Sequence, residues 1–168
     1  MPLIPDKIFN SFEELTPKFL KENNISALIL DVDNTLIPYE EKEPPTHVRN
    51  WLFEMQKEGI RIAFVTNNHK KRLLSFNSTL GFPAFANSAK PFLRNMKKAL
   101  RAMGVTAQTT ANMGDQIFTD VLAGKRLKIK TFLVPPIKDK RDPFTRLKRF
   151  FEKRHIRAYY ERNPKEQL

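Results

Sequence analysis

The sequence predicts an α/β domain in three layers, with a parallel β-sheet between layers of helices. Short apolar runs such as 27–30 and 60–65 are typical of strands that are buried on both faces of a parallel sheet. Helical segments alternate with these runs, as βαβ units require. At 168 residues, of which 40% are hydrophobic, the chain has room for one compact domain and a short appendage.

The first half of the chain contains two strands and three helices by this reading. The segment 11–14 has the pattern of a capping box and predicts a short helix that ends at about residue 22. A helix at 46–58 follows the first strand, with Gly59 as its C-terminal cap. A basic helix follows the second strand and ends at about residue 80. Trp51 is assigned to the core rather than to a stacking platform, because its apolar neighbours follow helical spacing.

The second half repeats this alternation. Pro83 places a short strand at an edge of the sheet, and Pro91 suits the first position of a helix. In chain order, the predicted elements are a strand at 82–86, a helix at 91–103, a strand at 109–113, a short helix at 119–126, a strand at 130–134 and a C-terminal helix at about 143–160.

The composition excludes several classes of protein. The chain has no cysteine, which removes disulfides, thiolate catalysis and cysteine-bound zinc, and its three histidines argue against a histidine-built metal site. No apolar run approaches the roughly 18 to 20 residues of a membrane span, and the first residues lack the pattern of a secretory signal. We therefore expect a cytoplasmic protein, with peripheral contact to the inner face of the membrane as a further expectation.

The positive charge is concentrated near the C-terminus. Residues 138–168 contain 11 Lys or Arg and 5 Asp or Glu, so about a fifth of the chain carries half of the net charge of +12. This excess favours anionic partners: nucleic acid, phosphorylated ligands or an acidic membrane surface. We accordingly divide the chain into a core, 1–137, and a basic aromatic helix and tail, 138–168.

Polar residues follow four of the predicted strands. The carboxyl ends of parallel strands meet at one edge of a sheet, where ligands bind in open α/β folds. The set offers four carboxylates, one ammonium group and the hydroxyl groups of Thr35 and Thr66, and such oxygen ligands suit Mg²⁺. The candidate site residues are Asp31, Asp33, Thr66, Asn67, Lys90, Asp115 and Asp120.

Four motifs in a fixed order resemble the signatures of the haloacid dehalogenase-like (HAD) superfamily. They are DVDNT at 31–35, FVTN at 64–67, Lys90 before a proline, and GDQIFTD at 114–120. Each motif alone is weak, but the ordered set is specific, and the resemblance covers residues 25–135. It implies a Rossmann-like fold and Mg²⁺-dependent chemistry on a phosphate ester.

The resemblance also implies roles for individual residues. Asp31 would attack phosphorus and form an aspartyl-phosphate, while Asp33 would protonate the leaving oxygen and then activate water. A carboxylate at position 33 is typical of the phosphatases of the superfamily. Thr66 would bind the phosphoryl oxygens, and Lys90 would neutralise their charge and hold Asp31.

The remaining candidates concern the metal and the substrate. Asp115, Asp31 and the carbonyl oxygen of Asp33 would bind Mg²⁺, and Asp120 would pair with Lys90 or support the metal. Asn67 is a candidate substrate-binding residue, although capping of the following helix, together with Asn68, is the favoured role for its side chain.

The spacing of the motifs leaves no room for the cap domain that covers the site in many HAD enzymes. Only 29 residues lie between Thr35 and Val65, and 22 between Asn67 and Lys90. Capless members, subclass III, often act on bulky substrates. The stretch GDQIFTDVLAGKRL is similar to the YqeG-like proteins and phosphatidylglycerophosphate phosphatases of subclass IIIA. That likeness implies conversion of phosphatidylglycerophosphate to phosphatidylglycerol.

Two other functions stay open at this stage. One is a phosphatase of nucleotides, nucleic-acid ends or a small metabolite, and the other is a binding module that keeps the fold without catalysis. The C-terminal helix has two interpretations, of which packing on the core is the favoured one. Phe144, Leu147 and Phe151 would either pack on the core or, with the surrounding basic residues, contact an anionic bilayer.

Overall fold

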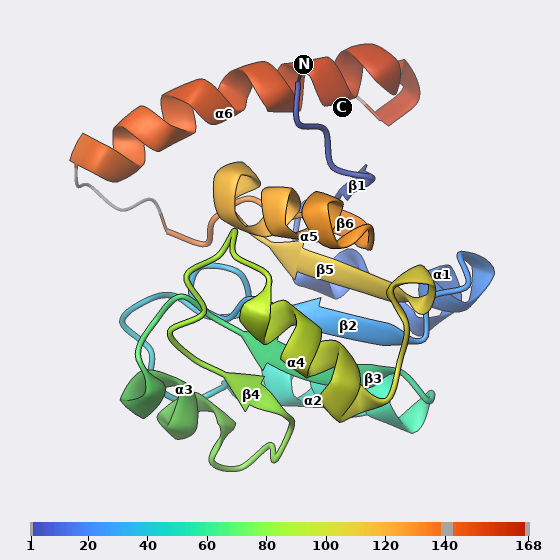
Figure 1. Cartoon of the computed structure of the whole chain (residues 1–168), viewed down its shortest axis with the longest axis vertical. Helices are drawn as coiled ribbons and strands as arrows, with labels where there is room; N and C mark the ends of the chain where they lie inside the picture. The colour runs from blue at the N-terminus through green and yellow to red at the C-terminus, as the bar shows by residue number, and fades with distance from the viewer. Residues whose placement is uncertain (1, 139–142, 167–168) are drawn as a thin grey trace.

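The computed structural model describes residues 2–138 and 143–166. Its centre is a parallel sheet of six strands in the order β1-β6-β5-β2-β3-β4 (Figure 1). This confirms the predicted fold class. The strands are β1 (Lys7–Ile8), β2 (Ala27–Leu30), β3 (Arg61–Val65), β4 (Ala84–Phe85), β5 (Thr110–Gly114) and β6 (Lys130–Leu133).

Strand β2 lies in the middle of the sheet and carries the first motif at its carboxyl end. Leu28 and Leu30 face one hydrophobic cluster, whereas Ala27 and Ile29 face another, because successive side chains of a strand alternate between the two faces. All four residues of β2 are buried. The strand pairs with β3 on one side and β5 on the other, which brings the ends of these three strands together.

The helices form two layers around this sheet. Helices α1, α2 and α3 contribute to the cluster on one face, while α4 and α5 cover the other (Figure 1). The helices and helical turns are η1 (Phe12–Glu14), α1 (Pro17–Glu22), α2 (Thr46–Lys57), α3 (Lys70–Asn77), α4 (Arg94–Met103), η2 (Ala107–Thr109), η3 (Ile117–Val121), α5 (Leu122–Leu127), α6 (Pro143–Arg162) and η4 (Pro164–Glu166). Trp51 is buried on α2, as predicted, and donates to the carbonyl oxygen of Leu15.

Two predicted helix starts were wrong by a few residues. The segment that begins at Ser11 forms only η1, and Thr16 caps the separate helix α1 through its hydroxyl group. Helix α4 begins three residues after Pro91, which instead lies in a turn closed by a hydrogen bond from Phe92 to Ala89. In both places a local turn satisfies backbone groups that the predicted helix would have used.

Strand β1 was missed in the sequence because it has only two residues and is formed by pairing with β6. The N-terminal segment that contains it also contacts α6. The backbone N–H of Leu3 donates to Nδ1 of His155, and that of Ile8 donates to the hydroxyl oxygen of Tyr159. The two ends of the chain therefore stabilise each other, and Figure 1 shows the N-terminal segment rising to α6.

Helix α6 packs against the core through a different face from the one that its apolar spacing predicted. Glu152 and Tyr159 are buried, and Ile156 contacts the cluster formed by η3 and β6. Leu147 and Phe151 are more than half exposed, so the prediction that they pack on the domain was wrong. The buried stripe is partly polar because its side chains bind backbone groups and carboxylates of the core. The side chain of Phe144 lies outside the described residues.

The loops between the motifs are short, as expected for a capless protein. The segment from β2 to β3 contains only a loop and α2, and the segment from β3 to Lys90 contains only α3, β4 and turns. Among the described residues, no helix is both long enough and apolar enough to cross a bilayer.

Candidate active site

The carboxyl ends of β2 and β5 bring an ammonium group and two carboxylates into direct contact. Nζ of Lys90 lies 2.9 Å from Oδ1 of Asp31 and 2.6 Å from Oδ1 of Asp120. All three side chains are at most 10% exposed. Asp31 directly follows β2, and Asp120 lies on η3, the helical turn after β5. The predicted pairing of Lys90 with both carboxylates is therefore present.

A third carboxylate joins this group. Oxygen atoms of Asp31, Asp115 and Asp120 lie within 4.8 Å of one another, and all three residues are buried. The Oδ1 atom of Asp115 is buried and has no hydrogen-bond partner among the described residues. An unpartnered buried carboxylate oxygen beside two others is a favourable ligand for a hard cation. The residues present thus fit a divalent metal ion.

Burial and like charge raise the pKa values of two of these carboxylates. Burial raises the pKa of Asp31 to about 8, against the opposing charge of Lys90. Burial also raises the pKa of Asp115 to about 6, with a further contribution from the charge of Asp120. Burial alone would lower the pKa of Lys90, but the charges of Asp120 and Asp31 hold it above its ordinary value. A bound cation would favour the ionised carboxylates and so oppose their raised pKa values.

The Asp33 side chain is held by a residue that the sequence analysis missed. Nε and Nη2 of Arg72, on α3, each lie 2.8 Å from Oδ1 of Asp33, and the amide of Asn68 donates to Oδ2. Arg72 also donates to the carbonyl oxygens of Pro38 and Glu41 and so attaches the loop after β2 to Asp33. The side chain of Asp33 is not part of the cluster of carboxylates that Asp31, Asp115 and Asp120 form. The metal ligand predicted for Asp33 is its backbone carbonyl oxygen.

Thr66 and Asn67 lie at the end of β3, as predicted. The buried hydroxyl of Thr66 accepts from the N–H of Asn68. The side chain of Asn67 accepts from the backbone N–H of Lys90 at 2.6 Å and donates to its carbonyl oxygen. Asn67 therefore positions the lysine, and the helix cap predicted for Asn67 and Asn68 is instead His69, whose Nδ1 accepts from Arg72.

A residue of α6 also reaches the site and was not predicted. Nη2 of Arg149 lies 2.5 Å from Oδ2 of Asp115. The sequence marks Arg149 only as one of many basic residues in the C-terminal helix, and 34 residues separate it from its partner. No local pattern distinguishes it.

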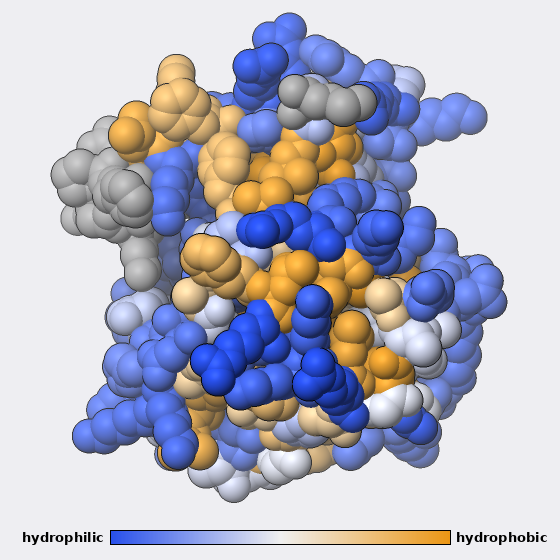
Figure 2. Space-filling view, viewed as in Figure 1, coloured by the Kyte–Doolittle hydropathy of each residue, from blue (hydrophilic) through white to orange (hydrophobic). Residues whose placement is uncertain are grey.

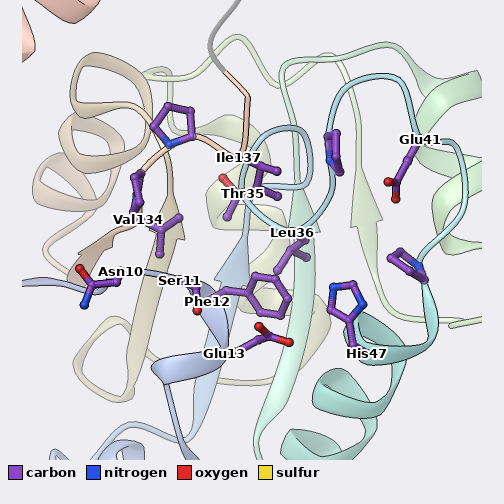
Figure 3. Close-up of a pocket in the computed structure, with 14 residues that line it drawn as sticks. Asn10, Ser11, Phe12, Glu13, Thr35, Leu36, Glu41, His47, Val134 and Ile137 are labelled. Atoms are coloured by element: carbon purple, nitrogen blue, oxygen red, sulfur yellow. The ribbon is translucent and has the colours of Figure 1, made fainter.

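Two hollows open beside the site. One, of about 370 Å³, lies next to the loop after β2. Figure 3 shows Leu36 and Phe12 on one side of it and His47 facing them from α2. The other, of about 360 Å³, lies between the β1–β6 edge and α6 and reaches Asp115 and Arg149. Most of the residues that line both hollows are apolar or proline.

Comparison with known proteins identifies the family. Residues 3–134 match the model of the haloacid dehalogenase-like hydrolases. The chain is 33% identical over 155 residues to the probable phosphatase YqeG of Bacillus subtilis, covering 92% of this chain and 90% of that protein. This chain therefore belongs to the haloacid dehalogenase-like hydrolase family.

Two further relatives are more distant. A glyceraldehyde 3-phosphate phosphatase of Pyrococcus abyssi is 25% identical over 116 residues, which cover 64% of this chain and 48% of that protein. The cobalt-bound deoxy-D-mannose-octulosonate 8-phosphate phosphatase YrbI of Haemophilus influenzae superposes with a TM-score of 0.55 at 20% identity. That superposition covers 68% of this chain and 70% of that one. The structural likeness supports the fold.

Proposed function

We propose that this protein is a Mg²⁺-dependent phosphatase that hydrolyses a phosphomonoester through an aspartyl-phosphate on Asp31. The observation that carries the proposal is the buried contact of Asp31 with Lys90, beside Asp115 and Asp120. Two anions, a carboxylate and a phosphate, do not approach each other unless positive charge is placed between them. The similarity over most of the chain to a probable phosphatase supports the same reaction.

The chain's own residues divide the work in this proposal. Lys90 binds Oδ1 of Asp31, and we assign the attack on phosphorus to Oδ2. Asp33 transfers a proton to the leaving oxygen, and after departure of the alcohol its carboxylate takes a proton from the water that attacks the aspartyl-phosphate. Asp31, Asp115 and the carbonyl oxygen of Asp33 would hold Mg²⁺. When bound, this ion supplies positive charge beside the phosphate.

The substrate that we propose is the phosphate headgroup of a lipid, phosphatidylglycerophosphate, which yields phosphatidylglycerol. Leu147, Phe150 and Phe151 are 55 to 66% exposed and lie at i, i+3 and i+4 on α6, so they form one apolar patch. Lys153 and Arg154 are exposed on the next turn. Exposed aromatic side chains beside basic ones suit the interface of an anionic bilayer.

The surface around the patch supports the same substrate. Figure 2 shows hydrophobic side chains at the surface over the N-terminal half of α6, with hydrophilic side chains around them. The hollow beside α6 reaches Asp115 and has a mainly apolar lining. It offers a place for the uncharged part of a lipid next to the proposed metal site.

Phosphate release from the full-length chain with Mg²⁺ tests this proposal. Vesicles that contain phosphatidylglycerophosphate are compared with glycerol 3-phosphate, nucleotides and 5′-phosphorylated oligonucleotides. We expect turnover on the vesicles to exceed turnover on each soluble substrate. Preference for a soluble ester would keep the phosphatase and reject the lipid, whereas no release from any substrate would reject the phosphatase as well.

Variants of the apolar patch separate membrane contact from catalysis. In the double variant Phe150→Ser/Phe151→Ser, turnover on vesicles should fall about tenfold or more. Burial of each aromatic ring in the bilayer interface contributes roughly 1.5 to 3 kcal/mol to membrane binding. Its turnover on p-nitrophenyl phosphate should stay at the wild-type level. Leu74→Ser, which removes another exposed apolar residue on α3, is the matched control. Equal losses on both substrates would contradict the membrane contact.

A further inference from the structure

Arg149 connects the C-terminal helix directly to a carboxylate of the site. Its Nη1 donates to the backbone carbonyl oxygen of Asp115 at 2.6 Å, and its Nη2 donates to Oδ2 of the same residue at 2.5 Å. The side chain of Asp115 is fully buried, while that of Arg149 is 21% exposed. One planar guanidinium group thus binds both the main chain and the side chain of Asp115, which fixes the rotation of the carboxylate.

Glu152, one turn further along α6, completes this connection. Its Oε2 accepts from Nη1 of Arg149 at 2.8 Å, and its Oε1 accepts from the backbone N–H of Ile117 at 2.8 Å. Glu152 is only 2% exposed. Helix α6 therefore holds both ends of the turn between β5 and η3, and this turn carries Asp115.

The two oxygen atoms of Asp115 have different surroundings. Oδ2 is bound by Arg149, whereas Oδ1 is buried without a hydrogen-bond partner among the described residues. A buried oxygen of this kind is unfavourable unless a ligand satisfies it. Carboxylates that bind metals commonly use one oxygen for the ion, while a neighbouring donor orients the other.

We propose that Arg149 is a positioning residue for the metal site: it holds Oδ2 of Asp115 so that Oδ1 is presented to a divalent cation. Glu152 supports it by fixing both the guanidinium group and the turn. Helix α6 then belongs to the active centre, although the match to the family model ends at residue 134. The inference deepens the proposed Mg²⁺-dependent function, but it concerns metal binding and can be measured without a substrate.

The inference is tested by measuring the affinity of the whole chain for Mn²⁺ with electron paramagnetic resonance. Arg149→Gln removes the charge and one of the two contacts, and we expect the affinity for Mn²⁺ to fall about 10- to 100-fold, as is typical for the loss of an orienting partner. Arg149→Lys keeps the charge but cannot make both contacts, so its affinity should fall as well. Glu152→Gln should change affinity in the same direction by less.

The control is Arg157→Gln on the same helix, where an exposed arginine pairs only with Glu161 among the described contacts. This variant should bind Mn²⁺ like the wild type. Circular dichroism in EDTA reports whether each variant is folded. If Arg149→Gln is unfolded, the Mn²⁺ affinity of Arg149→Lys tests the inference instead. Unchanged or tighter Mn²⁺ binding by a folded Arg149 variant would overturn the inference.

The same measurements separate this inference from the proposed function. If the wild type binds Mn²⁺ and the Arg149 variants bind it weakly, the inference stands even when no phosphate is released. If the wild type hydrolyses phosphate esters and the Arg149 variants bind Mn²⁺ normally, the function stands and the inference fails.

Discussion

Nζ of Lys90 lies 2.9 Å from Oδ1 of Asp31, although 59 residues separate them along the chain. Asn67 holds the backbone of Lys90 on one side, and Asp120 holds its ammonium group at 2.6 Å. The positive charge is therefore fixed beside the proposed nucleophile before a substrate arrives. Such preorganised charge lowers the reorganisation that a reaction requires.

Asp31→Asn should remove phosphatase activity and leave the fold intact. The amide cannot attack phosphorus, so we expect turnover to fall by about 1,000-fold or more. The variant loses a buried group whose pKa is raised by burial, and its thermal midpoint should equal or exceed that of the wild type. Turnover and thermal unfolding are measured on the same preparation.

The control for this variant is Asp6→Asn, which changes a carboxylate at the β1–β6 edge that binds Thr131 and Lys125. It should lose some stability and keep its turnover. Mg²⁺-dependent turnover by Asp31→Asn at the wild-type level would contradict the assignment of the nucleophile.

Lys90→Met should destabilise the metal-free protein. The substitution leaves Asp120 buried without its cation, and breaking a buried ion pair from one side costs about 3 to 5 kcal/mol. Adding Asp120→Asn to this variant should restore part of the free energy of unfolding, while activity stays low because Asp31 still lacks its partner. Urea unfolding in EDTA measures the free energy of unfolding of the single and the double variant. A Lys90→Met variant as stable as the wild type would contradict the argument.

The stability of the metal-free protein should fall as the pH rises, and bound metal should weaken this dependence. On folding, the pKa of Asp31 rises from 3.8 to about 8 and that of Asp115 rises from 3.8 to about 6. The folded metal-free protein keeps protons that the unfolded chain releases in this range. These two groups therefore make the free energy of unfolding fall as the pH rises from about 4 to 8.

Metal binding displaces the same protons, so stabilisation by Mg²⁺ should increase with pH. Thermal midpoints in EDTA and in Mg²⁺, measured at intervals from pH 5 to 8, give this difference directly. Asp31→Asn should show a weaker pH dependence in EDTA. An equal Mg²⁺-induced shift at pH 5 and pH 8 would contradict the linkage.

Gly114→Ala should disturb the site through packing. A Cβ atom at this position would lie 2.5 Å from Cβ of Asp120 and would displace that side chain from Lys90. Overpacking of this kind typically costs about 1 to 3 kcal/mol. Gly124→Ala, whose added methyl group would overlap Thr131 rather than Asp120, is the matched control. Both variants should lose stability, but only Gly114→Ala should lose Mn²⁺ affinity.

Much of the fold and site could be predicted because the signals are local. The apolar run of β2 and the polar residues directly after it are adjacent in sequence, so Asp31 could be placed at a strand end without a structure. Lys90 and Asp120 could be assigned to the same edge because parallel strands share a carboxyl edge. The contacts of Lys90 with both carboxylates follow that expectation.

The contacts of the two arginines were not predictable in this way. Arg72 binds Asp33 across 39 residues and Arg149 binds Asp115 across 34, and both arginines lie in segments where basic residues are frequent. Which arginine turns inward depends on how α3 and α6 pack, and this is a property of the assembled chain.

The sequence by itself determined the order of the helices and of strands β2 to β6, the edge of the sheet where the chemistry lies and the carboxylates that gather there. These follow from backbone periodicity and from the polarity of residues next to each strand end. Only the tertiary structure decided which face of α6 is buried. Its apolar spacing favoured burial of Leu147 and Phe151, but Glu152 and Tyr159 are buried instead. Polar groups of the core require partners once water is excluded, and α6 supplies them to Asp115, Ile117 and Ile8.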